Sequence, residues 1–188
     1  MNKERLVAFT DAIIAIVVTL LVLDLPRPDG PSLAALLAEW RSLVIYVATF
    51  FLIMIVWYNH HILFTAADKI NRTTYWLNTI WLLLQSFIPF CTSWLSDYPA
   101  SSVPGLVYVL VTFLWAVTFQ MLGRNLEKLN ANVVMPNRYA FPLLYLSYFL
   151  EALLFVFSPI FGVIITPLMA GGIVVGSSIF ERKSSSNH

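Results

Sequence analysis

The chain has 188 residues, of which 59% are apolar and only 11% carry a charged side chain. Soluble domains have about 25% charged residues, so this composition excludes a soluble globular protein and predicts an integral membrane protein. The net charge of +1 gives no information about a nucleic-acid partner, and the sequence has no basic tract to indicate one, so none is expected; a single cysteine excludes an intrachain disulfide.

The first apolar run, residues 6–25, is long enough to cross the ~30 Å hydrocarbon core of a bilayer as a helix. The only charge between residues 6 and 23 is Asp11, set about two turns into the run. A carboxylate at that depth costs several kcal/mol unless it is paired or hydrogen-bonded. Two interpretations stay open: Asp11 is a structural residue partnered by Arg5 and a histidine of the second helix, or it is the relay of a proton-coupled transporter.

A helical projection at about 100° per residue separates the faces of this first helix. Ile16, Leu20 and Leu23 fall within one narrow stripe with Thr19 at its edge, and Asp11 and Val18 point to roughly the opposite side. On composition alone, ordinary helix packing is the favoured interpretation of the stripe.

The remaining elements follow in order. Three prolines and a glycine in residues 24–31 predict a turn, after which Ser32 can cap a short amphipathic piece at residues 33–40. A Ser158-Pro159 pair divides the last apolar stretch into two helices. The sequence therefore predicts an all-α membrane protein with one domain at residues 1–183, a disordered tail at 184–188, and six spans at about 6–25, 43–64, 75–95, 103–122, 140–157 and 160–180.

Basic residues set the expected orientation in the membrane. Nine lie at the two termini and in the second and fourth connections, whereas the opposite side carries only Arg27 and Arg41. The positive-inside rule then predicts a multi-pass protein of the cell membrane with both termini in the cytoplasm.

This orientation gathers the buried polar groups of the first three spans in the cytoplasmic leaflet, where they can satisfy one another. We expect them to form a structural network with these members: Arg5, Thr10, Asp11, Trp57, His60, His61 and Asn78. Glu151 is the exception, because it lies at about the middle of the fifth span. It is either protonated or faced by another helix.

No motif indicates catalysis or a bound cofactor. His60 and His61 are neighbours on a helix, so their side chains diverge by about 100° and cannot easily share one metal ion. The only other histidine is His188, and the sequence has no HExxH or CxxC motif. The sequence therefore predicts neither an enzyme nor a metal site.

The segment that begins Arg5-x-x-x-Phe9-Thr10-Asp11 and continues AIIAIVVTLLVLDL resembles the signature helix of the transmembrane protein 175 (TMEM175) family of potassium channels. Members of that family read Phe-Ser-Asp where this chain has Phe-Thr-Asp. NHHILF at residues 59–64, WLN at 76–78 and IPFCT at 88–92 resemble the family's second and third helices. The specific resemblance covers the first half of the chain.

The resemblance implies a member of the bacterial branch, with one six-helix unit per chain, a homotetrameric assembly and a pore lined by the first helix of each subunit. It implies the narrowest pore ring at Ile16, further apolar rings at Leu20 and Leu23, and a role in cation preference for Thr19. It also implies a packing network on the cytoplasmic side, made of Arg5, Phe9, Thr10, Asp11, His60 and His61. The threonine at position 10 keeps the hydroxyl of the usual serine and adds a methyl group.

Our hypothesis is a potassium-preferring cation channel in the lipid bilayer, with a hydrophobic constriction, no TVGYG-type filter and no cofactor besides the permeating K⁺. Permeation by other monovalent cations stays open at this point. The alternative is a small secondary transporter in which Asp11 or Glu151 takes up protons or cations. Flux that saturates and is coupled to a second ion would identify the transporter.

Overall fold

Local signals fix both ends of α1 (Lys3–Leu23) in this computed structural model, which describes residues 2–99, 101–135 and 140–157. The side-chain oxygen of Asn2 accepts a hydrogen bond from the backbone N–H of Arg5 at 3.3 Å and so caps the first turn. After Leu23 the chain meets a proline-rich turn that cannot continue a helix. The helix therefore begins and ends slightly earlier than the predicted range of 6–25.

The predicted amphipathic piece is the short helix α2 (Leu33–Ala38), and its predicted cap is confirmed. Ser32 Oγ accepts a hydrogen bond from the backbone N–H of Ala35 at 3.1 Å. The second span, α3 (Trp40–Ala66), extends beyond the predicted range of 43–64 at both ends.

The third predicted span, residues 75–95, is two helices rather than one. They are α4 (Arg72–Ser86) and α5 (Ile88–Asp97), separated at Phe87. Pro89 explains the break, because it has no N–H to donate to the carbonyl of Gln85 one turn earlier. Asn71 fixes the start of α4 through a capping box in which its Oδ1 accepts from the Thr74 N–H at 2.8 Å.

The fourth span, α6 (Ser102–Leu129), continues past its predicted end at Leu122 into a stretch that the sequence indicated as a polar connection. Leu122 and Leu126 lie one turn apart, and both are fully buried in one core cluster, so packing maintains the helix among its polar neighbours. The fifth span, α7 (Ala140–Phe157), has the predicted bounds. The predicted sixth span at 160–180 and the tail at 184–188 lie outside the described residues.

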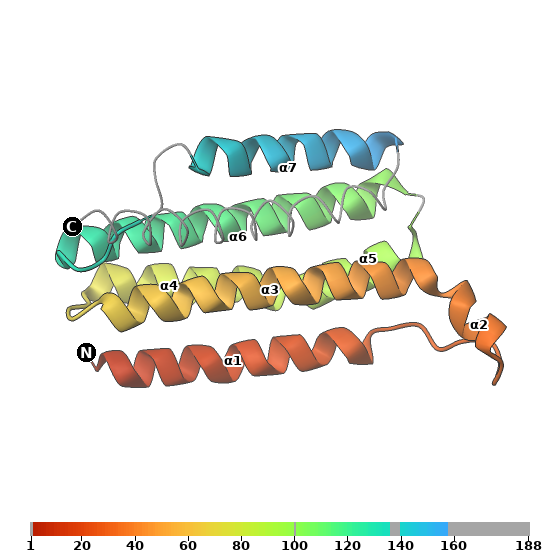
Figure 1. Ribbon diagram of the computed structural model, residues 1–188, viewed down its shortest axis with the longest axis horizontal. Helices are drawn as coiled ribbons and strands as arrows, with labels where there is room; N and C mark the ends of the chain where they lie inside the picture. The colour runs from red at the N-terminus through yellow and green to blue at the C-terminus, as the bar shows by residue number, and fades with distance from the viewer. Residues whose placement is uncertain (1, 100, 136–139, 158–188) are drawn as a thin grey trace, which may run out of the picture.

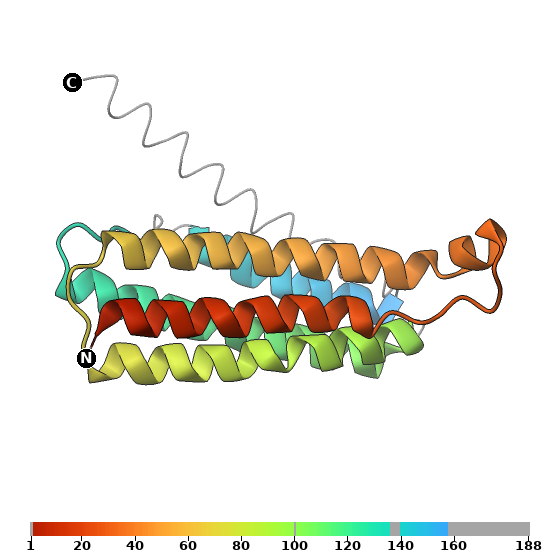
Figure 2. The same ribbon diagram turned by 90° about the horizontal axis from the view of Figure 1, so that it is seen from below.

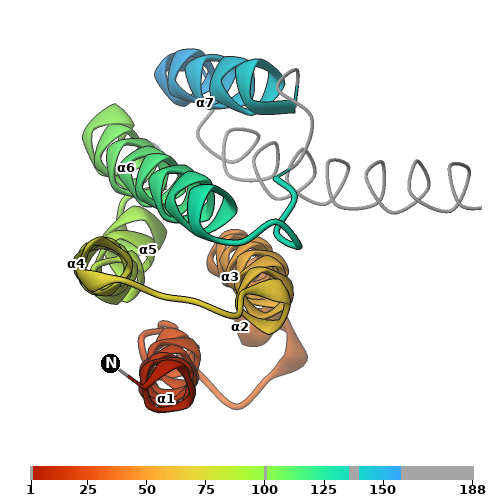
Figure 3. The same ribbon diagram turned by 90° about the vertical axis from the view of Figure 1, so that its left-hand side faces the viewer.

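The long helices run side by side along one axis (Figure 1), and the view from below shows the same roughly parallel arrangement (Figure 2). Seen end-on, α1 lies at one edge of the bundle and α7 at the opposite edge, with α6 beside α7 (Figure 3). α1 packs on α3, α4 and α5, while α6 packs on α4, α5 and α7. Because α1 is at an edge, the described helices cover only one of its sides.

Two hydrogen-bonded clamps join the helix ends near the N-terminus of α1. Lys3 Nζ donates to two carbonyls at the end of α3, at 2.7 and 3.1 Å. The buried side chain of Asn130 accepts from the backbone N–H groups of Asp68 and Lys69 at 2.9 and 2.7 Å, and it donates back to the Lys69 carbonyl at 2.9 Å. These contacts fix α1, α3 and α6 to one another at this end of the bundle.

The described residues contain no strand, and four stretches are long and apolar enough to cross a membrane: Lys3–Leu23, Trp40–Ala66, Arg72–Asp97 and Ser102–Leu129. A shorter apolar helix covers Pro142–Phe155. The fold is therefore all-α and of the membrane-spanning type.

Candidate functional site

α1 buries one stripe of side chains against its own chain. The buried residues recur every three or four positions and lie on one helical face: Leu6, Thr10, Ile14, Val17 and Leu21. Val18 is half-buried and packs at the edge of the same core. This face carries the contacts that hold α1 in the bundle.

The other face of α1 carries large apolar side chains that the described helices leave uncovered. The exposed fractions are 63% for Phe9, 58% for Ile16 and 75% for Leu23, and Leu20 is also exposed. Thr19 lies on this face, and its hydroxyl donates to the Ile16 carbonyl at 2.8 Å, which leaves the hydroxyl oxygen free to accept. The predicted stripe of Ile16, Leu20 and Leu23 is therefore turned away from its own subunit.

A chain of three buried polar side chains lies under the covered face of α1. Asn78 Nδ2 donates to Thr10 Oγ1 at 2.8 Å, and Asn78 Oδ1 is 2.9 Å from His60 Nε2. Thr10 Oγ1 in turn donates to the Leu6 carbonyl at 2.9 Å. Three members of the predicted network, contributed by α1, α3 and α4, are thus in contact.

Asp11 has a different partner from the one predicted. Its Oδ1 accepts a hydrogen bond from the indole Nε1–H of Trp57 at 3.0 Å, and neither Arg5 nor a histidine is its hydrogen-bond partner. Arg5 is exposed on the same side of α1 as Phe9. The reason is rotational: Arg5 and Asp11 are six residues apart, which puts them on different faces of the helix.

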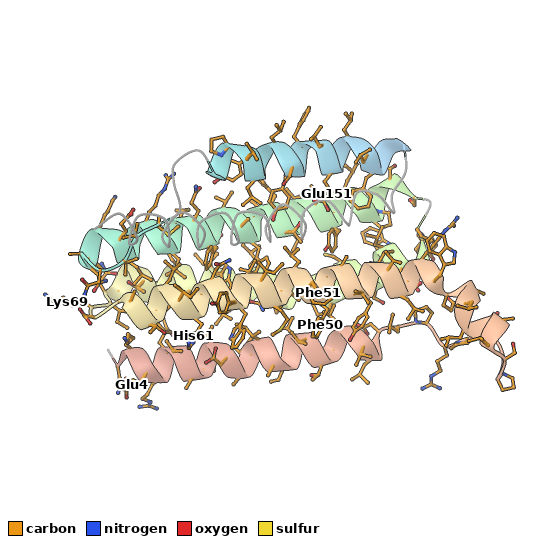
Figure 4. All side chains as sticks on the ribbon, in the orientation of Figure 1. Glu4, Phe50, Phe51, His61, Lys69 and Glu151 are labelled. Carbon is orange, nitrogen blue, oxygen red and sulfur yellow. The ribbon has the colours of Figure 1, made fainter. Side chains whose placement is uncertain are left out.

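The two adjacent histidines have different surroundings, as their helical spacing predicts. His60 is buried in the polar chain, whereas His61 is exposed and its ring lies 6.1 Å from that of Trp57. Figure 4 shows His61 beside α1. Among the described residues, no three His, Cys, Asp or Glu side chains are grouped in a way that could hold a metal ion.

An aromatic stack, missed in the sequence, continues inward from His60. The imidazole lies between the rings of Phe64 and Trp81, with centroid distances of 4.4 and 4.8 Å, and Trp81 stacks on Trp115 at 5.6 Å. The spacing of Asn78, Trp81 and Gln85 along one face of α4 was the signal that could have revealed this row.

Glu151 is fully buried on α7, and Figure 4 shows it on the side of that helix toward α6. It lies within electrostatic reach of the phenols of Tyr108 and Tyr148. The Tyr108 hydroxyl is 3.0 Å from Thr49 Oγ1, and Tyr148 donates to the Thr112 carbonyl at 3.2 Å. Of the two interpretations above, the geometry agrees with a Glu151 that faces another helix.

The fold and this face define an integral membrane protein of bundled helices whose first span is only half covered by the described part of the chain. Residues 5–89 match the family model described as the endosomal/lysosomal potassium channel TMEM175. A crystal structure of a lysosomal potassium-selective channel TMEM175 homologue from Chamaesiphon minutus superposes with a TM-score of 0.76 at 26% identity, covering 93% of this chain and 97% of that one.

Sequence relatives agree with the structural match. A potassium channel of Streptomyces collinus is 38% identical over 137 residues, which are 68% of this chain and 66% of that protein. A potassium channel of a Chryseobacterium species is 33% identical over 65% of this chain and 64% of its own length. The human endosomal/lysosomal proton channel TMEM175 is 35% identical over 47% of this chain and 20% of its own length.

The chain belongs to the TMEM175 family. The alignments with the two bacterial relatives span about two thirds of those proteins. The relatives are named as ion channels, so the family is one of channels and not of enzymes. The roles of Ile16, Leu20, Leu23 and Thr19 in a pore remain predictions.

Proposed function

We propose that this chain is the subunit of a homotetrameric, potassium-preferring cation channel in the cell membrane, and that α1 from each of four copies lines the pore. The observation that carries the proposal is the uncovered face of α1, where Ile16, Leu20 and Leu23 form an apolar row with Thr19 beside it. The bacterial relatives are named potassium channels, and this supports the same ion for this chain.

The chemistry of this face suits a pore whose barrier is set by width and wetting. Four copies of Ile16 around an axis make a constriction without fixed charge, in which a hydrated ion must squeeze or shed water. Among the side chains of this row, Thr19 provides the oxygen that can accept from water or contact a cation. We assign the constriction to Ile16, Leu20 and Leu23, and the cation preference to Thr19.

The polar contacts on the other side of α1 support this assignment. Thr10 is tied to Asn78 and Asp11 is tied to Trp57, so α1 is held to α4 and α3 near its cytoplasmic end. Rotating α1 to bury the apolar row would break both contacts and leave buried polar groups unpaired. The uncovered face is therefore a stable feature that requires a partner or lipid.

The names of the relatives point to two ions. The bacterial proteins are called potassium channels, whereas the human protein is called a proton channel. Protons are thus the second candidate for the permeating ion, and the experiment must measure both.

The test is reconstitution of the purified protein in liposomes, with reversal potentials measured in potassium, sodium and proton gradients. The proposal expects current that grows linearly with driving force and reverses near the potassium equilibrium potential. Flux that saturates and stops without a second ion would instead identify a coupled transporter. No flux from an assembled protein would overturn the channel assignment.

A further inference from the structure

The middle of the subunit core contains polar atoms that the fold leaves unpaired. Gln85 is 0% exposed, and neither atom of its amide has a hydrogen-bond partner in the described part of the chain. The indole N–H groups of Trp81 and Trp115 are equally buried and equally unpaired among those residues. Native proteins pair the great majority of such groups, so each of these requires an explanation.

These side chains are neighbours. Trp81 and Gln85 lie one turn apart on the same face of α4, and Trp81 stacks on Trp115 of α6 with an angle of 11° between the ring planes. Both ends of the Gln85 amide, a donor and an acceptor, therefore lie beside the stacked indoles.

His60 extends this group of buried polar side chains toward the predicted cytoplasmic end of the bundle. Its ring stacks on Trp81, and its Nδ1 has no partner within the described residues. Asn78 Nδ2 donates to Thr10, so the Asn78 oxygen is the atom facing His60, and His60 Nε2 must carry the hydrogen. Nδ1 is therefore an acceptor.

The mixture of donors and acceptors identifies the ligand. Two indole N–H groups and the Gln85 amide N–H₂ repel a cation, while the Gln85 amide oxygen and His60 Nδ1 repel an anion. A neutral molecule that both donates and accepts satisfies all of them, and water is the smallest such molecule. Polar surroundings of this kind are where proteins hold ordered internal water.

We propose that each subunit holds a small cluster of ordered water between α4 and α6, bound by Gln85, Trp81 and Trp115. The same core cluster includes Ile14 and Val17 on the covered face of α1, so this water lies directly behind the helix that we assign to the pore. Its role is to give the Gln85 amide and the two indole N–H groups hydrogen-bond partners, which stabilises the core behind α1. The site is separate from the ion path and does not depend on which ion permeates.

The first test uses Gln85→Met, which keeps the length of the side chain and removes its hydrogen bonds. Bound water loses a partner in this variant, so the melting temperature of the assembled protein in detergent should fall, by about 2–4 °C. Without water the substitution removes an uncompensated buried amide and should raise the melting temperature. Leu82→Met, in the same helix and also buried, controls for the packing of methionine.

Ultraviolet resonance Raman spectra supply the deciding measurement, because an indole band reports whether the N–H is hydrogen-bonded. The difference between the parent and Trp81→Phe should show a hydrogen-bonded Trp81, and Gln85→Met should weaken that signature. A Trp81 that is not hydrogen-bonded in the parent overturns the proposal whatever the melting temperatures are.

Liposome flux separates this proposal from the proposed function. Assembled Gln85→Met should keep the reversal potential of the parent and conduct within about twofold of it. If the parent itself carries no ion flux, the channel assignment fails, while the Raman result still decides whether the core binds water.

Discussion

Asn78 is the residue on which the polar chain beneath α1 depends. Its amide nitrogen bonds Thr10 on α1, and its oxygen faces His60 on α3, so one side chain joins three helices. All of these groups are buried, and none can exchange its partner for bulk water. In such a site the loss of one partner costs more than the hydrogen bond itself contributes.

Asn78→Leu should therefore destabilise the protein by about 2–4 kcal/mol, because it leaves His60 unpaired and reduces the bonding of Thr10. The measurement is thermal melting of the assembled protein in detergent. Thr79→Val is the matched control, since the Thr79 hydroxyl bonds only the Tyr75 carbonyl of its own helix. Equal melting temperatures for the two variants would mean that the buried chain adds no stability.

Asp11 and Trp57 provide a second test, because their contact at 3.0 Å is a single hydrogen bond between two helices. Asp11→Ala and Trp57→Phe should each impair assembly, and the double variant should be little worse than either one. Asp11→Asn keeps an acceptor for the indole and should assemble nearly as well as the parent. The flux distinguishes the two roles of Asp11. If the assembled Asp11→Asn variant lost a pH-dependent flux that the parent has, Asp11 would be a proton relay.

The sequence could predict which residues gather near one end of the bundle but not which of them pair. Hydropathy gives the depth of a residue along its helix and the positive-inside rule gives the direction of each helix, and together these were enough to group Thr10, His60 and Asn78. Pairing depends on rotation about each helix axis and on the packing between helices. For Asp11 these favour Trp57 over the charged Arg5, which an inspection of charge alone would select.

At the scale of whole elements, the sequence predicted helix ends least accurately where buried contacts extend a helix or a single residue interrupts it. α7 has the predicted bounds, but α6 continues through polar residues because Leu122 and Leu126 are buried on its inner face. The break between α4 and α5 had a visible cause in Pro89, but its position inside a continuous apolar run concealed it. Periodicity of buried side chains is thus more informative than mean polarity.

The two faces of α1 should respond differently to substitution. Ile16→Asn, on the uncovered face, should raise cation flux because it wets the constriction. Val17→Ala, on the covered face, should leave conductance per channel unchanged and destabilise the protein by about 1–2 kcal/mol.

Thr19→Val should lower the preference for potassium and leave assembly intact. Measured flux per assembled channel separates these effects, and an Ile16→Asn variant without increased flux would remove the pore from this face.

At the scale of the whole molecule, an edge helix with one apolar face uncovered is incomplete as a single copy. Lipid alone would be a sufficient partner for that face, but it would give no reason for Thr19 to lie among the apolar residues. Symmetric association around an axis covers the face with copies of itself and produces a continuous path through the membrane. The clamps of Lys3 and Asn130 then hold α1, α3 and α6 together at the end of each subunit where α1 begins.

The orientation of that path is the last prediction. The positive-inside rule predicts that both termini lie in the cytoplasm, with the turn after α1 outside and the connection after α6 inside. A cysteine in place of Asp29 should react with an impermeant thiol reagent added to intact cells, and one in place of Ala131 should react only after permeabilisation.

Both positions are exposed, and Ala131 avoids the clamp made by its neighbour Asn130. Cys91 is buried, and a Cys91→Ser background removes its signal. Labelling at position 131 in intact cells, with none at position 29, would reverse the assigned orientation and make the Thr10, His60 and Asn78 network extracytoplasmic.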